Sequence, residues 1–148
     1  MDNIVKEFSN IKQVAASLKK KAKQISSVNT LSVEDASRHC MMLWKSKMPS
    51  SSGRSMKNIY YTISKKGEVT TGKVISPANM KRGGFLLNLF LEGVYGGGIS
   101  PGTTSIPKAG FVQPYKLRHG VFGAGVLAAR ATKPFFKGLI VDRVRGVL

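Results

Sequence analysis

The residues with reactive side chains are few in this chain, and they lie far apart. Its two histidines are His39 and His119, and its single cysteine is Cys40. His39 and Cys40 are neighbours in a segment with helical spacing, where successive side chains point in different directions, so they do not form a nucleophile–base pair. One cysteine and two distant histidines also do not make a zinc-binding pattern. We interpret Cys40 as a small core residue and His119, which follows Lys116 and Arg118, as a loop or interface residue.

Two glycine clusters invite comparison with nucleotide-binding loops. The cluster between Gly93 and Gly98 lacks the Gly-Lys-Ser/Thr ending that supplies a lysine and a metal ligand to phosphates. The sequence Gly123-Ala124-Gly125 lacks the third glycine and the downstream acid of a dinucleotide site. The one adjacent carboxylate pair, Glu34 and Asp35, fits the start of a helix better than a metal site. We therefore expect no enzyme activity, no cofactor and no bound metal.

Net charge is the most unusual property of the composition. The 148 residues include 24 Lys and Arg against seven Asp and Glu, which gives a formal net charge of +17. The basic residues are spread along the whole chain, whereas a polycationic tail would concentrate them at one end. Self-repulsion of this size favours a polyanionic neighbour. Nucleic acid, an acidic protein surface and an anionic membrane all fit the charge.

The sequence shows no export or membrane signal. The first residues lack the continuous apolar stretch of a secretory signal, and the longest apolar run, from Phe85 to Ile99, is broken by polar residues and glycines. A single cysteine allows no intrachain disulfide. We expect a protein that is in the cytoplasm when it is made and does not bind membranes.

Two helical segments are predicted before residue 48. Apolar residues recur at spacings of three and four over residues 4–25, and the opposite side carries lysines: Ile4, Phe8, Ile11, Ala15, Leu18, Ala22 and Ile25 against Lys6, Lys12, Lys19, Lys20 and Lys23. This pattern is typical of an amphipathic helix that packs on a core or a partner; a helix lying on a membrane or contacting nucleic acid remains open. Ser26 to Thr30 predicts a break. Ser32 then fits the N-cap of a second helix that ends near Lys47, before Pro49.

The rest of the chain predicts a small sheet and a last helix. Alternation after Ile59, with a turn at Ser64–Gly67, predicts a β-hairpin within residues 57–75. Residues 85–92 fit either a short helix or a buried strand, and residues 93–120 form a long Gly/Pro-rich loop. Pro134 fits the first position of a helix over residues 134–148. The prediction is one α+β domain, residues 1–148, with a small antiparallel sheet flanked by an N-terminal helical part (residues 1–47) and a C-terminal helix.

Three short motifs occur in an order that resembles a family of tail-component proteins, which includes neck proteins of tailed bacteriophages. The segment Met48–Ile59 resembles the family's pattern of a proline, a short polar stretch, Thr/Ser-Gly and then Leu-Arg-x-Ser-Ile. The segment Leu89–Gly93 is similar to its apolar stretch that ends in Glu-aromatic-Gly-Thr. The segment Ala131–Gly138 is similar to its Pro-x-Pro-Phe-Leu-x-Pro-Ala entry into a C-terminal helix.

The resemblance implies a structural virion protein of the neck or tail-completion region. Such a protein would be assembled in the host cytoplasm as a homo-hexameric or dodecameric ring at the head–tail junction, around the DNA channel. Its partners would be copies of itself, neighbouring connector and tail proteins, and DNA contacted without sequence preference. The resemblance suggests six candidate electrostatic contacts, each of which is otherwise a solvated surface charge: Arg54, Lys57, Lys81, Arg82, Lys116 and Arg118.

Two other classes of protein fit the sequence. A basic nucleic-acid-associated protein, such as a ribosomal or other ribonucleoprotein component, would use its dispersed lysines and arginines on phosphates. Tyr60 and Tyr61, between Lys57 and Lys65, could add aromatic contacts, although alternation places one tyrosine on each face of a strand. No zinc finger, RRM signature or KH loop is present. A capsid-decorating or tail-tube subunit is the third possibility.

Overall fold

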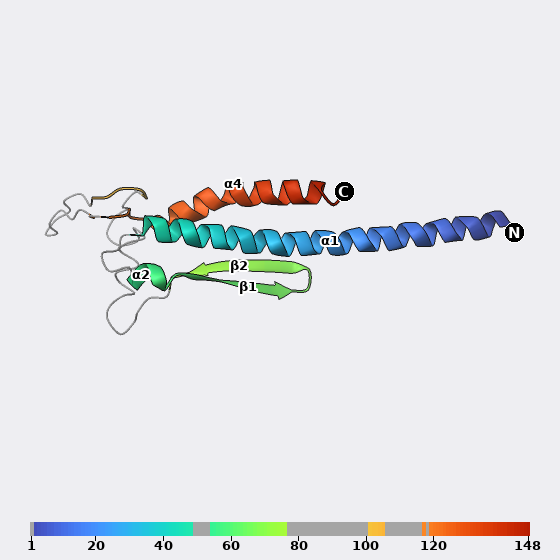
Figure 1. Ribbon diagram of the computed structural model, residues 1–148, viewed down its shortest axis with the longest axis horizontal. Coiled ribbons are helices and arrows are strands. Elements are labelled where there is room, and N and C mark those ends of the chain that lie inside the picture. Colours follow the sequence, from blue (N-terminus) through green and yellow to red (C-terminus); the bar gives the residue numbers. More distant parts are fainter. Residues whose placement is uncertain (1, 49–53, 77–100, 106–116, 118) are drawn as a thin grey trace.

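A computed structural model describes residues 2–48, 54–76, 101–105, 117 and 119–148, and it has the predicted α+β arrangement. Its long first helix lies between a β-hairpin on one side and a second long helix on the other (Figure 1). The elements, in chain order, are α1 (Asp2–Lys47), α2 (Arg54–Lys57), β1 (Tyr60–Lys66), β2 (Val69–Ile75) and α4 (Ala124–Arg145).

Helix α1 is continuous, so the predicted break at Ser26–Thr30 and the predicted N-cap at Ser32 are wrong. No glycine or proline lies between residues 2 and 47 to interrupt the helix. The hydroxyl groups that suggested a cap instead donate to the carbonyl oxygen four residues earlier. Thr30 donates to Ser26 O at 3.1 Å, and Ser32 donates to Val28 O at 2.8 Å. Serine and threonine can therefore stay inside a helix whose packing on both sides stabilises it.

Strands β1 and β2 form an antiparallel two-stranded sheet, at the place where the hairpin was predicted. Tyr60 pairs with Ile75 and Lys66 pairs with Val69, and Gly67 supplies the positive φ of 61° that the turn needs. Along β1 the exposed and half-buried residues alternate: Tyr60 is exposed, whereas Tyr61 is half-buried. The period of two therefore gave the correct face of the strand.

Helix α4 begins at Ala124, ten residues before the predicted start, and Pro134 lies inside it. Proline removes one hydrogen bond inside a helix, so the prediction placed it at the first turn. The alanine-rich stretch from residue 124 to 131 favours a helix, and its Ala124 and Ala128 are buried. Packing of this small-residue face offsets the hydrogen bond that Pro134 lacks.

Small side chains and one ion pair join α4 to α1, and the two helices run antiparallel. Phe135 stacks on His39, with ring centroids 4.0 Å apart. In the last turn of α4, Arg143 pairs with Asp35 and donates to Ser32 Oγ at 3.2 Å. Ser32 is fully buried, and a buried hydroxyl needs hydrogen-bond partners; the guanidinium of Arg143 is one of them.

The main apolar cluster lies at the end of the molecule where α1 finishes and α4 begins. Met48, Ile59, Leu117 and Phe122 are buried there, with Trp44 and other side chains packed against them. The backbone N–H of Val121 donates to Lys47 O at 3.0 Å, which ties the start of α4 to the end of α1.

A left-handed glycine precedes α4. Gly123 has a φ of 69°, and a Cβ there would lie 2.8 Å from Pro101 Cβ. Residues 101–105, 117, 119 and 120 are the described part of the predicted loop at 93–120. Gly102 N–H donates to Phe122 O, and Phe122 N–H donates to Thr103 O, both at 2.9 Å. The rest of that loop and the segment 85–92 lie outside the described residues.

Candidate functional site

Of the six predicted electrostatic contacts, the structure describes the side chain of Lys57 alone. Lys57 is exposed at the end of α2, and Arg54 begins that helix. The side chain of Arg54, and all of Lys81, Arg82, Lys116 and Arg118, lie outside the described part of the chain. These six residues therefore remain a prediction from the sequence.

The residues that were examined for chemistry lie in separate environments. His39 stacks on Phe135 of α4, whereas Cys40 lines a groove on a different face of α1. His119 is exposed. Within the described ranges, no three His, Cys, Asp or Glu residues lie close enough together to hold a metal ion. Likewise, none of the described helices has the length and apolar character needed to cross a membrane.

A groove lies between β2 and α4 in the described part of the chain, with α1 as its floor. Its volume is about 590 Å³. Fourteen residues from the three elements line it: Val33, Ala36, Ser37, Cys40 and Trp44 of α1, Thr70, Thr71, Gly72 and Val74 of β2, and Gly125, Ala129, Thr132, Lys133 and Phe136 of α4. The hairpin and α4 pack on different sides of α1 (Figure 1).

The groove is apolar, with small residues beside large ones. Gly72 lets β2 approach α1 closely, since a Cβ there would lie 2.1 Å from Ser37 Oγ. The hydroxyl of Ser37 is engaged, because it donates to Val33 O at 2.7 Å. Trp44 Nε1 is buried and has no hydrogen-bond acceptor among the described residues. A bulky apolar ligand would suit this lining better than a small polar one.

A second uncovered surface lies on the part of α1 that projects beyond the rest of the molecule. Lys21 Nζ donates to the carbonyl oxygen of Leu148 at 3.3 Å, and Lys65 Nζ to Ser26 Oγ at 3.2 Å, so both neighbouring layers end near these residues. Residues 2–20, which we call the arm, extend past them (Figure 1). Every side chain from Asn10 to Lys20 is exposed.

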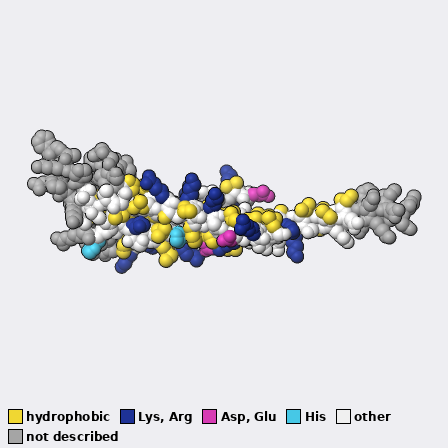
Figure 2. All heavy atoms as spheres, turned by 90° about the horizontal axis from the view of Figure 1, so that it is seen from above, with side chains coloured by type: hydrophobic (Ala, Val, Ile, Leu, Met, Phe, Trp, Pro, Cys, Tyr) yellow, Lys and Arg dark blue, Asp and Glu magenta, His cyan; other side chains and the backbone are white. Residues whose placement is uncertain are grey.

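Apolar side chains of the arm are exposed in a row. Ile11 and Leu18 are each 63% exposed and Val14 is 59% exposed. Figure 2 shows hydrophobic side chains along the narrow projecting part of the molecule. The helical spacing of the sequence predicted this apolar face. The spacing did not predict that this face stays uncovered, because its exposure depends on where α4 and the hairpin end.

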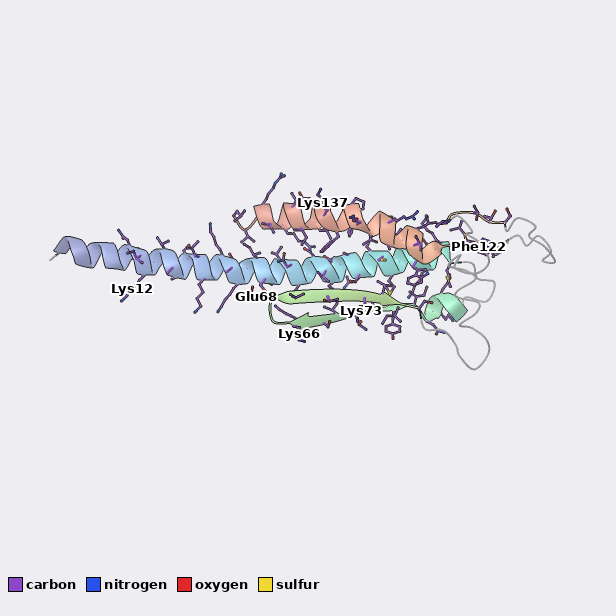
Figure 3. The ribbon with its side chains drawn as sticks, turned by 180° about the vertical axis from the view of Figure 1, so that it is seen from behind. Lys12, Lys66, Glu68, Lys73, Phe122 and Lys137 are labelled. Carbon is purple, nitrogen blue, oxygen red and sulfur yellow. The ribbon has the colours of Figure 1, made fainter. Side chains whose placement is uncertain are left out.

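Positive charge surrounds both uncovered surfaces. Figure 2 shows many Lys and Arg side chains and few acidic ones, and Figure 3 places Lys12 on the arm and Lys137 on the outer side of α4. Glu34 pairs with Arg38 and Asp35 with Arg143. A hydrogen bond with Tyr61 is the main cause that raises the pKa of Arg38 above its ordinary value, so this guanidinium keeps its charge.

Comparison of the chain with family models, curated proteins and solved structures gave no significant match. The candidate site therefore stands on the geometry and the charge of the chain itself.

Proposed function

We propose that this protein is a structural subunit of the neck or tail-completion region of a tailed bacteriophage, assembled as a ring around the DNA channel at the head–tail junction. One observation carries the proposal: two apolar surfaces, the groove and the arm, are uncovered in a single chain of net charge +17. Exposed apolar surface of this kind marks interaction sites, and such charge calls for acidic neighbours.

The shape of the subunit suits an assembly. Helix α1 has 46 residues and would be about 69 Å long at the usual rise of an α-helix. A subunit whose first helix extends far beyond its own body can contact neighbours on more than one side. In a ring, each copy presents two different surfaces to the copies beside it.

The order of the three sequence motifs directs the proposal to a phage neck. The leading helix, the hairpin after the first motif and the C-terminal helix stand in the order that the resemblance implies. Dispersed lysines and arginines would meet acidic faces of adjacent rings, and some would face DNA in the channel. DNA would be bound weakly and without sequence preference, through phosphates alone.

The second candidate is a basic nucleic-acid-associated protein, such as a ribonucleoprotein component. Three exposed lysines of the hairpin favour it: Lys65 and Lys66 lie near the turn, and Lys73 lies farther along β2. Phosphate contacts would satisfy these charges, but they would leave the apolar groove and arm uncovered. For this reason we rank this candidate below a protein assembly.

Light scattering of the purified protein separates the two candidates. Mass would be measured at about 100 mM and about 500 mM salt, with and without RNA, because phosphate contacts weaken steeply over this range. A discrete oligomer of ring size in the absence of RNA would support the neck proposal, and electron microscopy would then give its symmetry. A monomer whose mass rises only with RNA at low salt would contradict it and favour the ribonucleoprotein candidate.

A further inference from the structure

The arm and the groove lie on the same face of α1. An α-helix repeats its direction every 18 residues, after about five turns. Leu18 of the arm and Ala36 of the groove floor are separated by 18 positions, and so are Ala15 and Val33. At Leu18 the exposed apolar row of the arm is therefore in line with the floor of the groove, and the polar Asn29, 18 positions after Ile11, lies between the two. We call the row and the floor together the apolar track; it runs from Ile11 to Trp44, roughly 50 Å along α1.

The shape of the track favours an elongated occupant. Along the arm it is a helical stripe with spacings of three and four, the pattern that meets a second helix. Farther along it becomes a channel between β2 and α4, with small residues such as Ala36 and Gly72 on its lining. A helix fits both parts, because its side chains can interdigitate with the stripe and its body can lie between the two walls.

The charge beside the track favours an acidic occupant. Lys12 and Lys19 directly follow Ile11 and Leu18, and therefore flank the stripe on one side, with Lys23 in the same row. Lys133 lines the groove itself. No acidic residue occurs between Asn10 and Val33. The next two carboxylates, Glu34 and Asp35, already pair with arginines.

Other occupants fit the track less well. Nucleic acid would neutralise the charge of the lysines, but it would leave the apolar side chains exposed to water. A flat membrane would reach the arm but not the floor of a groove between β2 and α4. A second copy of α1 would bring its own arm lysines beside those of the first copy and beside Lys133.

We propose that the apolar track of α1 is a docking site for an acidic amphipathic helix of another protein. The apolar side of that helix would cover Ile11, Val14 and Leu18 and enter the groove, and its Glu or Asp residues would face Lys12 and Lys19. The proposal holds in either assembly named above and does not require a ring. Charge would steer the encounter, and burial of the track would supply most of the affinity.

The probe for the test is a synthetic peptide of about four heptads, with Leu at the two core positions and Glu at the flanking positions. Such a peptide repels itself, so it enters the titration without a partner of its own. Two matched probes are a peptide with Lys in place of each Glu, and one of the same composition in scrambled order. Vesicles of anionic phospholipid are the membrane probe.

Two residues of the groove report its occupation in the full-length protein. Trp44 is the only tryptophan of the chain and Cys40 is its only cysteine, and both line the groove. We expect the acidic peptide to shift the emission of Trp44 and to slow alkylation of Cys40, in a complex of one peptide per chain. The lysine peptide and the scrambled peptide should leave both signals unchanged.

Paired variants locate the contact, with circular dichroism to verify that each variant is folded. Ile11→Ala/Leu18→Ala should raise the dissociation constant about tenfold or more, because both side chains would be buried by the peptide. Gln13→Ala/Gln24→Ala, on the opposite side of α1 and equally exposed, should leave it unchanged. Ala129→Phe, which fills the groove, should weaken binding, whereas Ala131→Phe on another face of α4 should not.

Several results would overturn the proposal. Equal binding of the scrambled peptide would mean that charge alone attracts the probe, and equal binding of the lysine peptide would remove the acidic requirement. A Trp44 shift with vesicles that matches the peptide shift would assign the track to membranes. Self-association of the free chain that the Ile11→Ala/Leu18→Ala variant abolishes would assign it to a second copy.

Discussion

At the scale of single residues, β2 approaches α1 closely at Gly72. A Cβ added there would lie 2.1 Å from Ser37 Oγ and 3.0 Å from Val33 Cγ1. Ser37 is buried, and its hydroxyl is held by Val33 O. The lack of a side chain at residue 72 therefore sets the distance between the hairpin and the helix, and with it the width of the groove.

We expect Gly72→Ala to destabilise the protein by about 1–3 kcal/mol, because either Ser37 gives up its hydrogen bond or β2 moves away from α1. Thermal unfolding monitored by circular dichroism would measure the change. Gly138→Ala is the matched control: no atom lies within 4 Å of its added Cβ, and alanine favours the interior of α4. This control should stabilise the protein by ~0.5–1 kcal/mol. Equal effects of the two substitutions would contradict the close contact.

At the same scale, Arg143 shows how one side chain can serve two elements. It pairs with Asp35 and donates to the buried Ser32, so α4 satisfies a hydroxyl of α1 that the sequence marked as a helix cap. The guanidinium and the carboxylate are 32% and 36% exposed, so solvent screens the pair and its net contribution stays small. Its main effect is to fix the register of α4 along α1.

At the scale of the elements, α1 divides into a supported part and an unsupported part. From about residue 21 onward it has α4 on one side and the hairpin on another, whereas the arm has neither. Most of the stability of a helix in a protein comes from tertiary packing, which the arm lacks. The arm should therefore fray at its free end, and a docked helix would stabilise it.

Deletion of residues 2–19 should leave the stability of the body almost unchanged, with a melting temperature within about 3 °C of the full-length value. The side chains from Asn10 to Lys19 are exposed and bury little surface, so their loss removes little free energy. Helical signal in circular dichroism should fall, and amide exchange should be faster in the arm than in residues 28–44 of the full-length chain. Ala36→Gln, at a buried position of the same helix, serves as the destabilising comparison. A large drop in melting temperature after the deletion would show that the arm supports the fold.

At the scale of the whole molecule, repulsion among like charges opposes the compact state. The net charge of +17 is distributed over all the elements, and the two ion pairs found among the described residues engage Arg38 and Arg143, two of the 24 basic side chains. Salt screens such repulsion over about 10 Å at moderate ionic strength. The free subunit should therefore be less stable than its packing alone would allow.

The melting temperature should rise by a few degrees when salt is increased from about 50 mM to about 500 mM. Lys66→Glu/Lys137→Glu lowers the net charge by four at two exposed positions, so this variant should be more stable at low salt and less sensitive to added salt. The charge-conserving variant Lys66→Arg/Lys137→Arg should behave like the original protein. A decrease in the melting temperature of the original protein and of both variants with added salt would contradict this prediction. It would mean that attraction within ion pairs outweighs the repulsion among like charges.

By itself, the sequence determined the kinds of elements and their faces. Alternation around Tyr60 to Ile63 gave the hairpin, and the repeat of three and four from Ile4 to Ile25 gave an amphipathic helix, since both patterns are local properties of the backbone. The net charge, the composition and the scarcity of His and Cys are also read directly from the sequence. None of these properties depends on the tertiary contacts of the chain.

Only the tertiary structure decided where the helices start and stop and which apolar faces remain open. Contacts with α4 and the hairpin carry α1 through the serines at residues 26–32, and burial of Ala124 and Ala128 extends α4 in front of Pro134. The groove combines residues from three segments that are distant in the sequence, so no local pattern could predict it. A periodic pattern indicates that one face of an element favours burial. The lengths of the neighbouring elements decide how much of that face is covered within the chain itself.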